Sequence, residues 1–185
     1  MKKNIGVIFA IITSSLLITL TFNTMAQDHK MPEHDLLIEK AICVLNPTKG
    51  SSVSGTVIFT QTTQGIKVLA ELDGLTVGEH GFHIHEFGDC SAADGTSAGG
   101  HFNPEGHQHA GLGSEMNHIG DLGNLVADEN GHAHLEFTTS QIQLNGTNSI
   151  IGRSIIVHAQ ADDLKSQPTG NAGARVACGT IGIAK

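Results

Sequence analysis

Basic residues, thiols and repeats are scarce in this sequence of 185 residues, and each scarcity excludes a class of protein. Ten Lys and Arg stand against 18 Asp and Glu, giving a formal charge of −8, so a general nucleic-acid binder is not expected. Trp and Tyr are absent, and three cysteines do not make a cysteine-rich zinc module or a dense disulfide framework. Nor does any repeat of roughly 20 to 50 residues indicate a solenoid. Histidine is instead abundant, with 12 residues, and this excess of histidine indicates metal binding. The sequence also has 23 glycines.

Residues 1–26 have the features of a cleaved signal peptide. Lys2 and Lys3 precede an apolar run from Ile5 to Leu20, and Thr24-Met25-Ala26 ends in the small residues of a cleavage site. A membrane anchor is the alternative, but the run is shorter than the roughly 20 residues that span a bilayer. We therefore expect a periplasmic or secreted protein, with no membrane contact after cleavage.

The length that remains predicts one domain over residues 36–185. Residues 27–35 (QDHKMPEHD) are polar and predict a flexible N-terminal arm. His29 and His34 in this arm either pre-collect a metal ion or are simply solvated.

Short segments rich in β-branched residues, separated by Gly, Asn and Asp turns, make up the domain. This pattern predicts an all-β fold, an antiparallel sandwich or barrel, and no segment sustains a helical apolar period. The expected strands cover residues 36–45, 55–61, 65–72, 79–85, 122–127, 132–139, 152–158 and 175–183, with a hairpin joining 122–127 to 132–139.

Two long glycine-rich segments, 87–120 and 159–174, interrupt the strands, and long connections in a compact domain usually carry function. His83 and His85 lie two apart on the strand before the first segment, so their side chains point to the same face. Several imidazoles with one carboxylate suit copper or zinc. The pattern predicts a metal site and leaves a second one open. The other candidate ligands are His101, His107, His109, His118, Asp121 and His158.

Four motifs together resemble copper,zinc superoxide dismutase: 81–89 (GFHIHEFGD), 99–104 (GGHFNP), 118–124 (HIGDLGN) and 170–179 (GNAGARVACG). They follow the family's order, and the resemblance runs from about Ala41 to the C-terminus, nearly the whole mature chain. The resemblance implies an eight-stranded Greek-key β-sandwich, or flattened barrel, with two long functional loops.

The resemblance also implies two metal ions that share one histidine. His101 would bridge copper and zinc, which requires that both of its ring nitrogens lose their protons. Either His107 or His109 could be the zinc ligand in the loop; the family's spacing favours His109 and leaves His107 as an exposed bystander. The implied copper ligands are His83, His85, His101 and His158, and the implied zinc ligands are His101, His109, His118 and Asp121.

The same comparison implies roles around the metals. Asp162 would link a copper-bound and a zinc-bound histidine through hydrogen bonds, and His80 would be structural. Arg175 would act in catalysis together with His101, because its fixed, charged donors suit a small anion beside an open copper position. Thr169 would form the opposite lip of the channel.

The cysteines allow three pairings, and the sequence alone does not choose among them. The resemblance selects Cys90 with Cys178. Cys43 lies in an apolar run and is expected to be a buried, unpaired thiol.

The implied activity is that of an antioxidant oxidoreductase, which disproportionates superoxide to dioxygen and hydrogen peroxide. A histidine-bound copper would be alternately reduced and oxidised, while zinc would be structural and tune the bridging His101. Because the chain and its substrate are both negative, only a local positive field could guide entry.

The segment 163–169 lacks most of the charges that shape this field in the eukaryotic branch, and Cys90 lies closer to the His-x-His strand than in that branch. Both features resemble exported bacterial members of the family. A homodimer is possible, although no motif indicates one.

Two other functions fit parts of the pattern. An exported copper or zinc storage protein would keep the histidines but need neither Arg175 nor a bridging His101. A zinc hydrolase would need an open metal position and a free general base, and no uncommitted Glu lies in a ligand motif.

Overall fold

The computed structural model describes residues 37–185, so the expected signal peptide (1–26) and N-terminal arm (27–35) lie outside the described residues. Within 37–185 no helix is long and apolar enough to cross a membrane. The elements are β1 (Lys40–Pro47), β2 (Ser54–Thr62), β3 (Gly65–Asp73), β4 (Gly78–His85), the short 3-10 helix η1 (Thr96–Ala98), β5 (Asp121–Ala127), β6 (Ala133–Thr139), β7 (Ser154–His158) and β8 (Arg175–Ile183).

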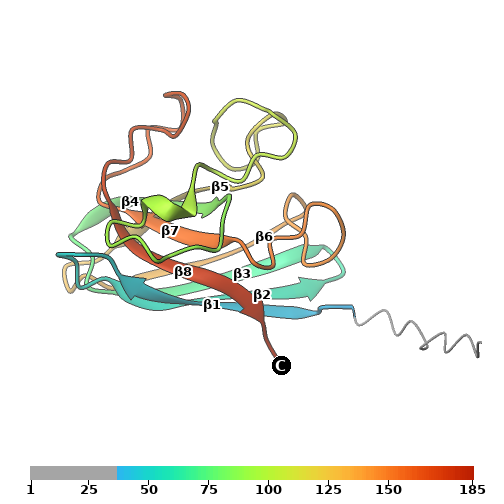
Figure 1. Ribbon diagram of the computed structural model, residues 1–185, viewed down its shortest axis with the longest axis horizontal. Coiled ribbons are helices and arrows are strands. Elements are labelled where there is room, and N and C mark those ends of the chain that lie inside the picture. The colour runs from blue at the N-terminus through green and yellow to red at the C-terminus, as the bar shows by residue number, and fades with distance from the viewer. Residues whose placement is uncertain (1–36) are drawn as a thin grey trace, which may run out of the picture. The chain divides into compact units, whose positions relative to one another are not determined.

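The strands form a closed antiparallel barrel in the order β1-β2-β3-β6-β5-β4-β7-β8 (Figure 1). β3 pairs with β6 and β4 with β7, so chain neighbours are separated as in a Greek key. The eight-stranded all-β prediction is therefore confirmed. The hairpin predicted between β5 and β6 is paired only next to its turn, at Ala127 and Ala133, whereas the opposite edge of β6 pairs with β3 along the whole strand.

The first strand begins later than the alternation predicted, at Lys40 rather than at residue 36. The backbone of Ile38 makes its hydrogen bonds with a side chain instead of a neighbouring strand. Its N–H donates to Asn145 Oδ1 at 2.9 Å, and its carbonyl accepts from Asn145 Nδ2 at 2.9 Å. The side-chain amide of a residue distant in sequence thus takes the place of inter-strand hydrogen bonds at this point.

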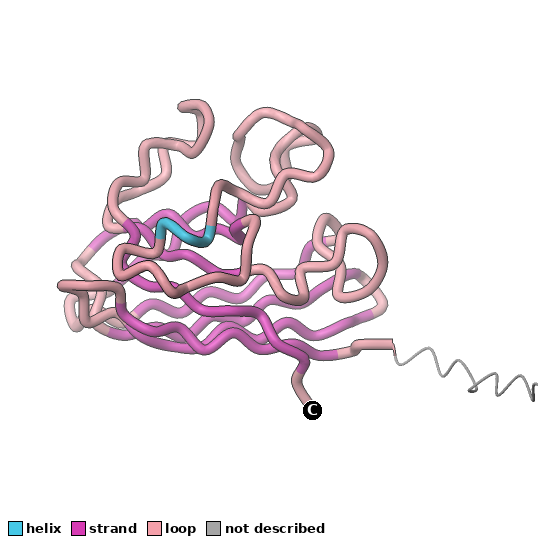
Figure 2. The backbone as a smooth tube through the Cα atoms, in the orientation of Figure 1, coloured by secondary structure: helices cyan, strands magenta, loops and turns pink. Residues whose placement is uncertain are grey.

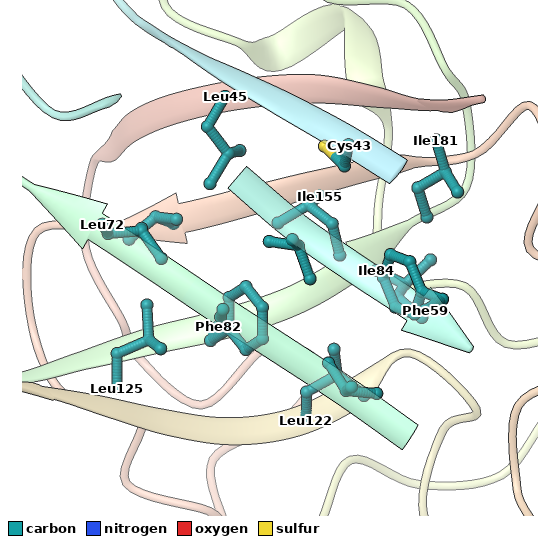
Figure 3. Packing of buried hydrophobic residues seen from close by; sticks show 14 of the residues in the cluster. Cys43, Leu45, Phe59, Leu72, Phe82, Ile84, Leu122, Leu125, Ile155 and Ile181 are labelled. Carbon is teal, nitrogen blue, oxygen red and sulfur yellow. The ribbon is translucent and has the colours of Figure 1, made fainter. Parts of the chain in front are cut away.

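The core lies inside the barrel and includes Phe59, Phe82, Leu125 and Ile155, which come from different strands (Figure 3). β4 is buried on both faces from His80 to His85. Its inward residues Phe82 and Ile84 join this core, and its outward residues are covered by the long connections. The barrel thereby provides a rigid, buried outer face for β4, on which a polar site can be built.

Those connections, residues 86–120 and 159–174, are the longest loops among the described residues and rise above the same side of the strands (Figures 1 and 2). The side chain of Gln167 joins them, because it accepts from His109 N at 2.8 Å and donates to His109 O at 2.8 Å. Two loops far apart in sequence therefore form one cover over β4.

A disulfide between Cys90 and Cys178 fastens the first loop to β8, which confirms the pairing that the resemblance implied. Cys43 is free and fully buried on β1, and burial raises the pKa of its thiol to about 12. It is an inert core residue at neutral pH.

Replacing both Cys90 and Cys178 by serine is expected to lower the free energy of unfolding by about 2–5 kcal/mol, because the bridge closes a loop with a sequence separation of 88 residues. Urea denaturation of wild type and variant under identical conditions measures the difference. Replacing Cys43 by serine instead tests burial of a polar atom without loss of a bridge. Equal stability of wild type and the double variant would contradict a stabilising role for this bond.

Candidate metal centre

Strand β4 places the first two candidate ligands. His83 and His85 alternate with the core residues Phe82 and Ile84, so both imidazoles lie on the outer face and are fully buried beneath the loops. His158 ends the neighbouring strand β7. The β7–β8 ladder is irregular between Val157 and His158, and such irregularities commonly re-aim a side chain beside a functional site.

The first loop is tied to β4 by a ring of three backbone hydrogen bonds. Ile84 N donates to Gly120 O, Gly120 N to Phe102 O, and Phe102 N to Ile84 O, each at 2.9 Å. Each of these three residues is the direct neighbour in sequence of a candidate ligand. Gly120 permits this approach because a Cβ there would lie 2.2 Å from Ile84 O, far inside van der Waals contact.

Two groups of buried ligand atoms result, and in each group all the atoms lie within 4.8 Å of one another. The groups match the two sets predicted from the sequence and share one member. The first comprises His83, His85, His101 and His158, and the second comprises His101, His109, His118 and Asp121.

Every imidazole of the first group has one nitrogen hydrogen-bonded and the other without a partner. The bonded atoms are His83 Nε2 to Asp162 (2.7 Å), His85 Nδ1 to Gly99 O (3.0 Å), His158 Nδ1 to Gly173 O (3.2 Å) and His101 Nδ1 to Asp121 (2.8 Å). The buried atoms left without a partner are His83 Nδ1, His85 Nε2, His101 Nε2 and His158 Nε2. Four convergent, unpaired buried nitrogens are costly unless a cation binds them, so this group fits copper.

The second group converges on one carboxylate oxygen. Asp121 Oδ1 lies 2.8 Å from His101 Nδ1, 3.0 Å from His109 Nδ1 and 3.3 Å from His118 Nδ1. Three imidazoles and one carboxylate are a donor set typical of a closed tetrahedral zinc site. The other oxygen, Oδ2, accepts from the backbone N–H groups of Ala110 and His118, which fixes the carboxylate.

His101 lies between the two groups. Its Nδ1 faces Asp121, its Nε2 faces the first group, and its ring centroid is 4.0 Å from that of His83. The side chain is almost completely buried. This geometry fits a histidine that contacts two cations through opposite nitrogens.

Asp162 links the groups from the second loop. Its two oxygens accept from His83 Nε2 at 2.7 Å and from His109 Nε2 at 2.9 Å. Asn124 on β5 holds the aspartate in turn, because its side chain accepts from Asp162 N and donates to Asp162 O. Carboxylates in this position fix the tautomer and orientation of ligating histidines.

Burial and these hydrogen bonds set the protonation of the site. Burial lowers the pKa of His83 to about 4 and that of His158 to about 3, so both rings are neutral and able to ligate at pH 7. Burial opposes the charge of His109, but hydrogen bonds to Asp121 and Asp162 outweigh it and raise its pKa to about 9. Burial disfavours ionised Asp121, yet hydrogen bonds from His101 and His109 hold its pKa well below the usual range.

Arg175, the first residue of β8, lies beside the first group. Its Nη1 donates to Gly95 O at 2.6 Å and its Nη2 to Gly99 O at 2.7 Å. Gly99 O also accepts from His85 Nδ1, so one carbonyl holds both a candidate copper ligand and the guanidinium. The positive charge of Arg175 contributes to the lowered pKa values of His85 and His158, after burial and neighbouring histidines.

Three other residues singled out from the sequence, namely His80, Thr169 and His107, lie outside the two ligand groups. His80 is buried, with Nδ1 bonded to His158 O and Nε2 to Thr76 O, each at 2.8 Å, and it has no nitrogen left for a metal. Thr169 is half-buried in the second loop. His107 lies outside both ligand groups but is half-buried rather than exposed. Its carbonyl accepts from His118 Nε2 at 3.1 Å, so its backbone orients a candidate ligand.

Two contributors were missed from the sequence. Asn124 lies inside the motif that includes Asp121, so its place in a ligand motif was an available signal. Gln167 holds His109 from the other loop, and no local pattern indicates that contact.

Comparisons with known proteins agree with this geometry. The family model described as copper/zinc superoxide dismutase matches residues 53–181. The extracellular superoxide dismutase [Cu-Zn] of Brugia pahangi is 46% identical over 152 residues, which cover 77% of this chain and 75% of that protein. The superoxide dismutase [Cu-Zn] of Onchocerca volvulus is 49% identical over 154 residues, covering 77% and 95%.

Among solved structures, the crystal structure of the clock protein EA4 matches with a TM-score of 0.73 and 43% identity, covering 80% of this chain and 96% of that one. The two sequence relatives are nematode proteins, and they lend no support to the expected likeness to bacterial members. The family match, the two identities and the paired ligand groups lead to one conclusion: this chain belongs to the copper/zinc superoxide dismutase family.

Proposed function

We propose that the chain disproportionates superoxide with copper held by His83, His85, His101 and His158 and zinc held by His101, His109, His118 and Asp121. The observation that carries this assignment is the sharing of His101 between two complete ligand groups. A storage protein or a hydrolase has no need of such a bridge. Metal analysis of the purified chain, paired with a superoxide assay, tests the proposal. One copper, one zinc and high activity are expected, and a fully loaded but inactive protein would overturn it.

Bound copper supplies the one-electron redox chemistry that the reaction requires, and zinc supplies a fixed positive charge. The protein positions His83, His85 and His158 as neutral imidazoles for the first ion, each oriented by a hydrogen bond from its other nitrogen. His101 is the shared ring, with Nε2 directed toward the copper group and Nδ1 toward Asp121 on the zinc side. The loops exclude bulk water from all of these rings.

Arg175 attracts and orients the anionic substrate. Its guanidinium is held by two loop carbonyls, so it offers charge and N–H donors without reorganisation. Thr169 would line the opposite side of the entrance. The formal charge of −8 makes this local positive charge the main source of attraction for an anion.

Replacing Asp162 by Asn is expected to weaken zinc binding roughly 10- to 100-fold, because an amide cannot accept from both His83 and His109. Equilibrium dialysis against a zinc chelator measures the change. The neighbouring Asp163→Asn variant is the matched control, since Asp163 is exposed and bonds only to residues of its own loop. Equal zinc affinity in wild type and Asp162→Asn would refute the linking role.

We further propose that the protein is secreted, supported by the extracellular name of the Brugia relative.

A further inference from the structure

Arg153 is a half-buried cation that belongs to neither ligand group. It directly precedes β7, and its backbone is fixed on both sides. Its N–H donates to Ile150 O at 3.0 Å, and its carbonyl accepts from Ile181 N at 2.8 Å. The next residue, Ser154, pairs with His85 in the β4–β7 ladder. The Arg153 side chain therefore starts from a fixed point beside the end of β4.

This side chain contacts both of the chain segments that carry the histidine pair, defined as His85 and His101. Arg153 Nη1 donates to Glu86 O at 2.5 Å, and the guanidinium carbon lies 4.3 Å from the centre of the Phe102 ring. Glu86 directly follows His85, and Phe102 directly follows His101. A planar guanidinium can stack on an aromatic ring and still donate hydrogen bonds from its edge. One side chain thus links the two residues that follow two candidate copper ligands.

The same two segments pair through their backbones on either side of the histidine pair. Phe102 N donates to Ile84 O and Glu86 N donates to Gly100 O, each at 2.9 Å. The histidine pair between these bonds forms an isolated antiparallel bridge. It is of the non-hydrogen-bonded kind, in which opposite side chains lie closest, and the two ring centroids are 5.1 Å apart. The separation of the two rings is thus set by the alignment of the two segments.

The free nitrogens of the histidine pair lie in the first ligand group. His85 Nε2 and His101 Nε2 are both buried without a partner, and the ligand atoms of this group all lie within 4.8 Å of one another. A functional site must hold such atoms to within about 0.5 Å of the productive geometry. Movement of one segment past the other would separate the two nitrogens. Arg153 opposes that movement because it contacts both segments.

We propose that Arg153 is a positioning residue for copper, because it holds together the two segments that place His85 and His101. This inference rests on the copper assignment proposed above. Loss of a residue that orients metal ligands typically weakens metal affinity 10- to 100-fold. The zinc group depends less on Arg153, because the carboxylate of Asp121 is held separately by two backbone N–H groups of its own loop.

Arg153→Gln is expected to weaken copper binding about tenfold and to leave zinc affinity close to that of wild type. Competition with a copper chelator, on protein whose second group already holds zinc, measures the first quantity. Competition with a zinc chelator on copper-free protein measures the second. Electron paramagnetic resonance of bound copper(II) is a further readout, because the hyperfine splitting reports the arrangement of the ligand nitrogens and is expected to change. Arg153→Lys keeps the charge but loses the planar fork, so an intermediate copper affinity is expected.

A double-mutant cycle tests the contact between the guanidinium and the aromatic ring. Phe102→Leu removes the ring but keeps an apolar side chain at this buried position. Arg153→Gln is expected to weaken copper binding less in the Phe102→Leu protein than in wild type, because part of the link is already gone. Strictly additive losses would show that the ring takes no part and would overturn the two-segment link.

Two controls separate position from charge and from stability. Lys67→Gln removes an exposed cation of β3, where Lys67 pairs with Glu136 at 2.9 Å, and is expected to match wild type in both readouts. Cys43→Ser perturbs the core on β1 and is expected to keep the wild-type copper spectrum. Wild-type copper affinity with an unchanged spectrum in Arg153→Gln would overturn the inference, as would equal losses of copper and zinc affinity. A wild-type chain that binds no copper would overturn the proposed function as well.

Discussion

Superoxide removal by an Arg175→Ala variant is expected to fall about tenfold or more in kcat/KM, with copper and zinc content unchanged. A local positive charge can raise the association rate of an anion by 10- to 1000-fold, and Arg175 is the cation that contributes to the field on both His85 and His158. Pulse radiolysis or stopped-flow measurement of superoxide decay gives the rate constant. Metal analysis of the same sample shows that the ligands are still occupied.

Two matched variants separate charge from geometry. Arg175→Lys keeps the charge but loses the two-pronged contact with Gly95 O and Gly99 O, so an intermediate rate is expected. Lys165→Ala removes an exposed cation of the second loop and is expected to have a much smaller effect. The wild-type rate should also fall more steeply with ionic strength than that of Arg175→Ala. An unchanged kcat/KM in Arg175→Ala would exclude a catalytic role for this residue.

Removal of both metal ions is expected to lower the melting temperature by roughly 10 °C or more. Ligand at 1000 times its Kd stabilises a fold by about 4 kcal/mol, and each kcal/mol shifts the melting temperature of a protein of this size by about 2–4 °C. The physical cause lies in the buried nitrogens of the centre, five of which have no hydrogen-bond partner when no cation is bound. Calorimetric melting before and after chelation at acidic pH measures the change.

Re-addition of metal provides the control for chelation. One equivalent of Zn²⁺ is expected to restore part of the melting temperature, and copper the remainder. An Asp121→Ala variant removes the carboxylate on which His101, His109 and His118 converge, so zinc should restore little in that protein. A melting temperature indifferent to chelation in wild type would show that the ligand groups are stable by themselves.

Strand positions could be predicted from the sequence because their signal is local. Alternation of apolar and polar residues fixes which side chains face the core, so β2, β3 and β4 were located to within one or two residues. The beginning of β1 and the extent of β5–β6 pairing were not predicted correctly, since both depend on partners elsewhere in the chain. Asn145 bonds the backbone of Ile38, and β5 pairs with β4 along most of its length but with β6 only at Ala127.

The chemical identity of the site was likewise contained in the sequence. His83 and His85 must share a face of their strand, and the motifs containing His101, His118 and Arg175 indicated the family. Which nitrogen of each ring is free was decided by the tertiary structure alone, because Asp162 contacts His83 across 79 residues and His109 across 53. Long-range hydrogen bonds of this kind leave no local pattern. The candidate ligands could therefore be predicted from the sequence, whereas the orientation of their rings depends on contacts that form only when the two loops cover β4.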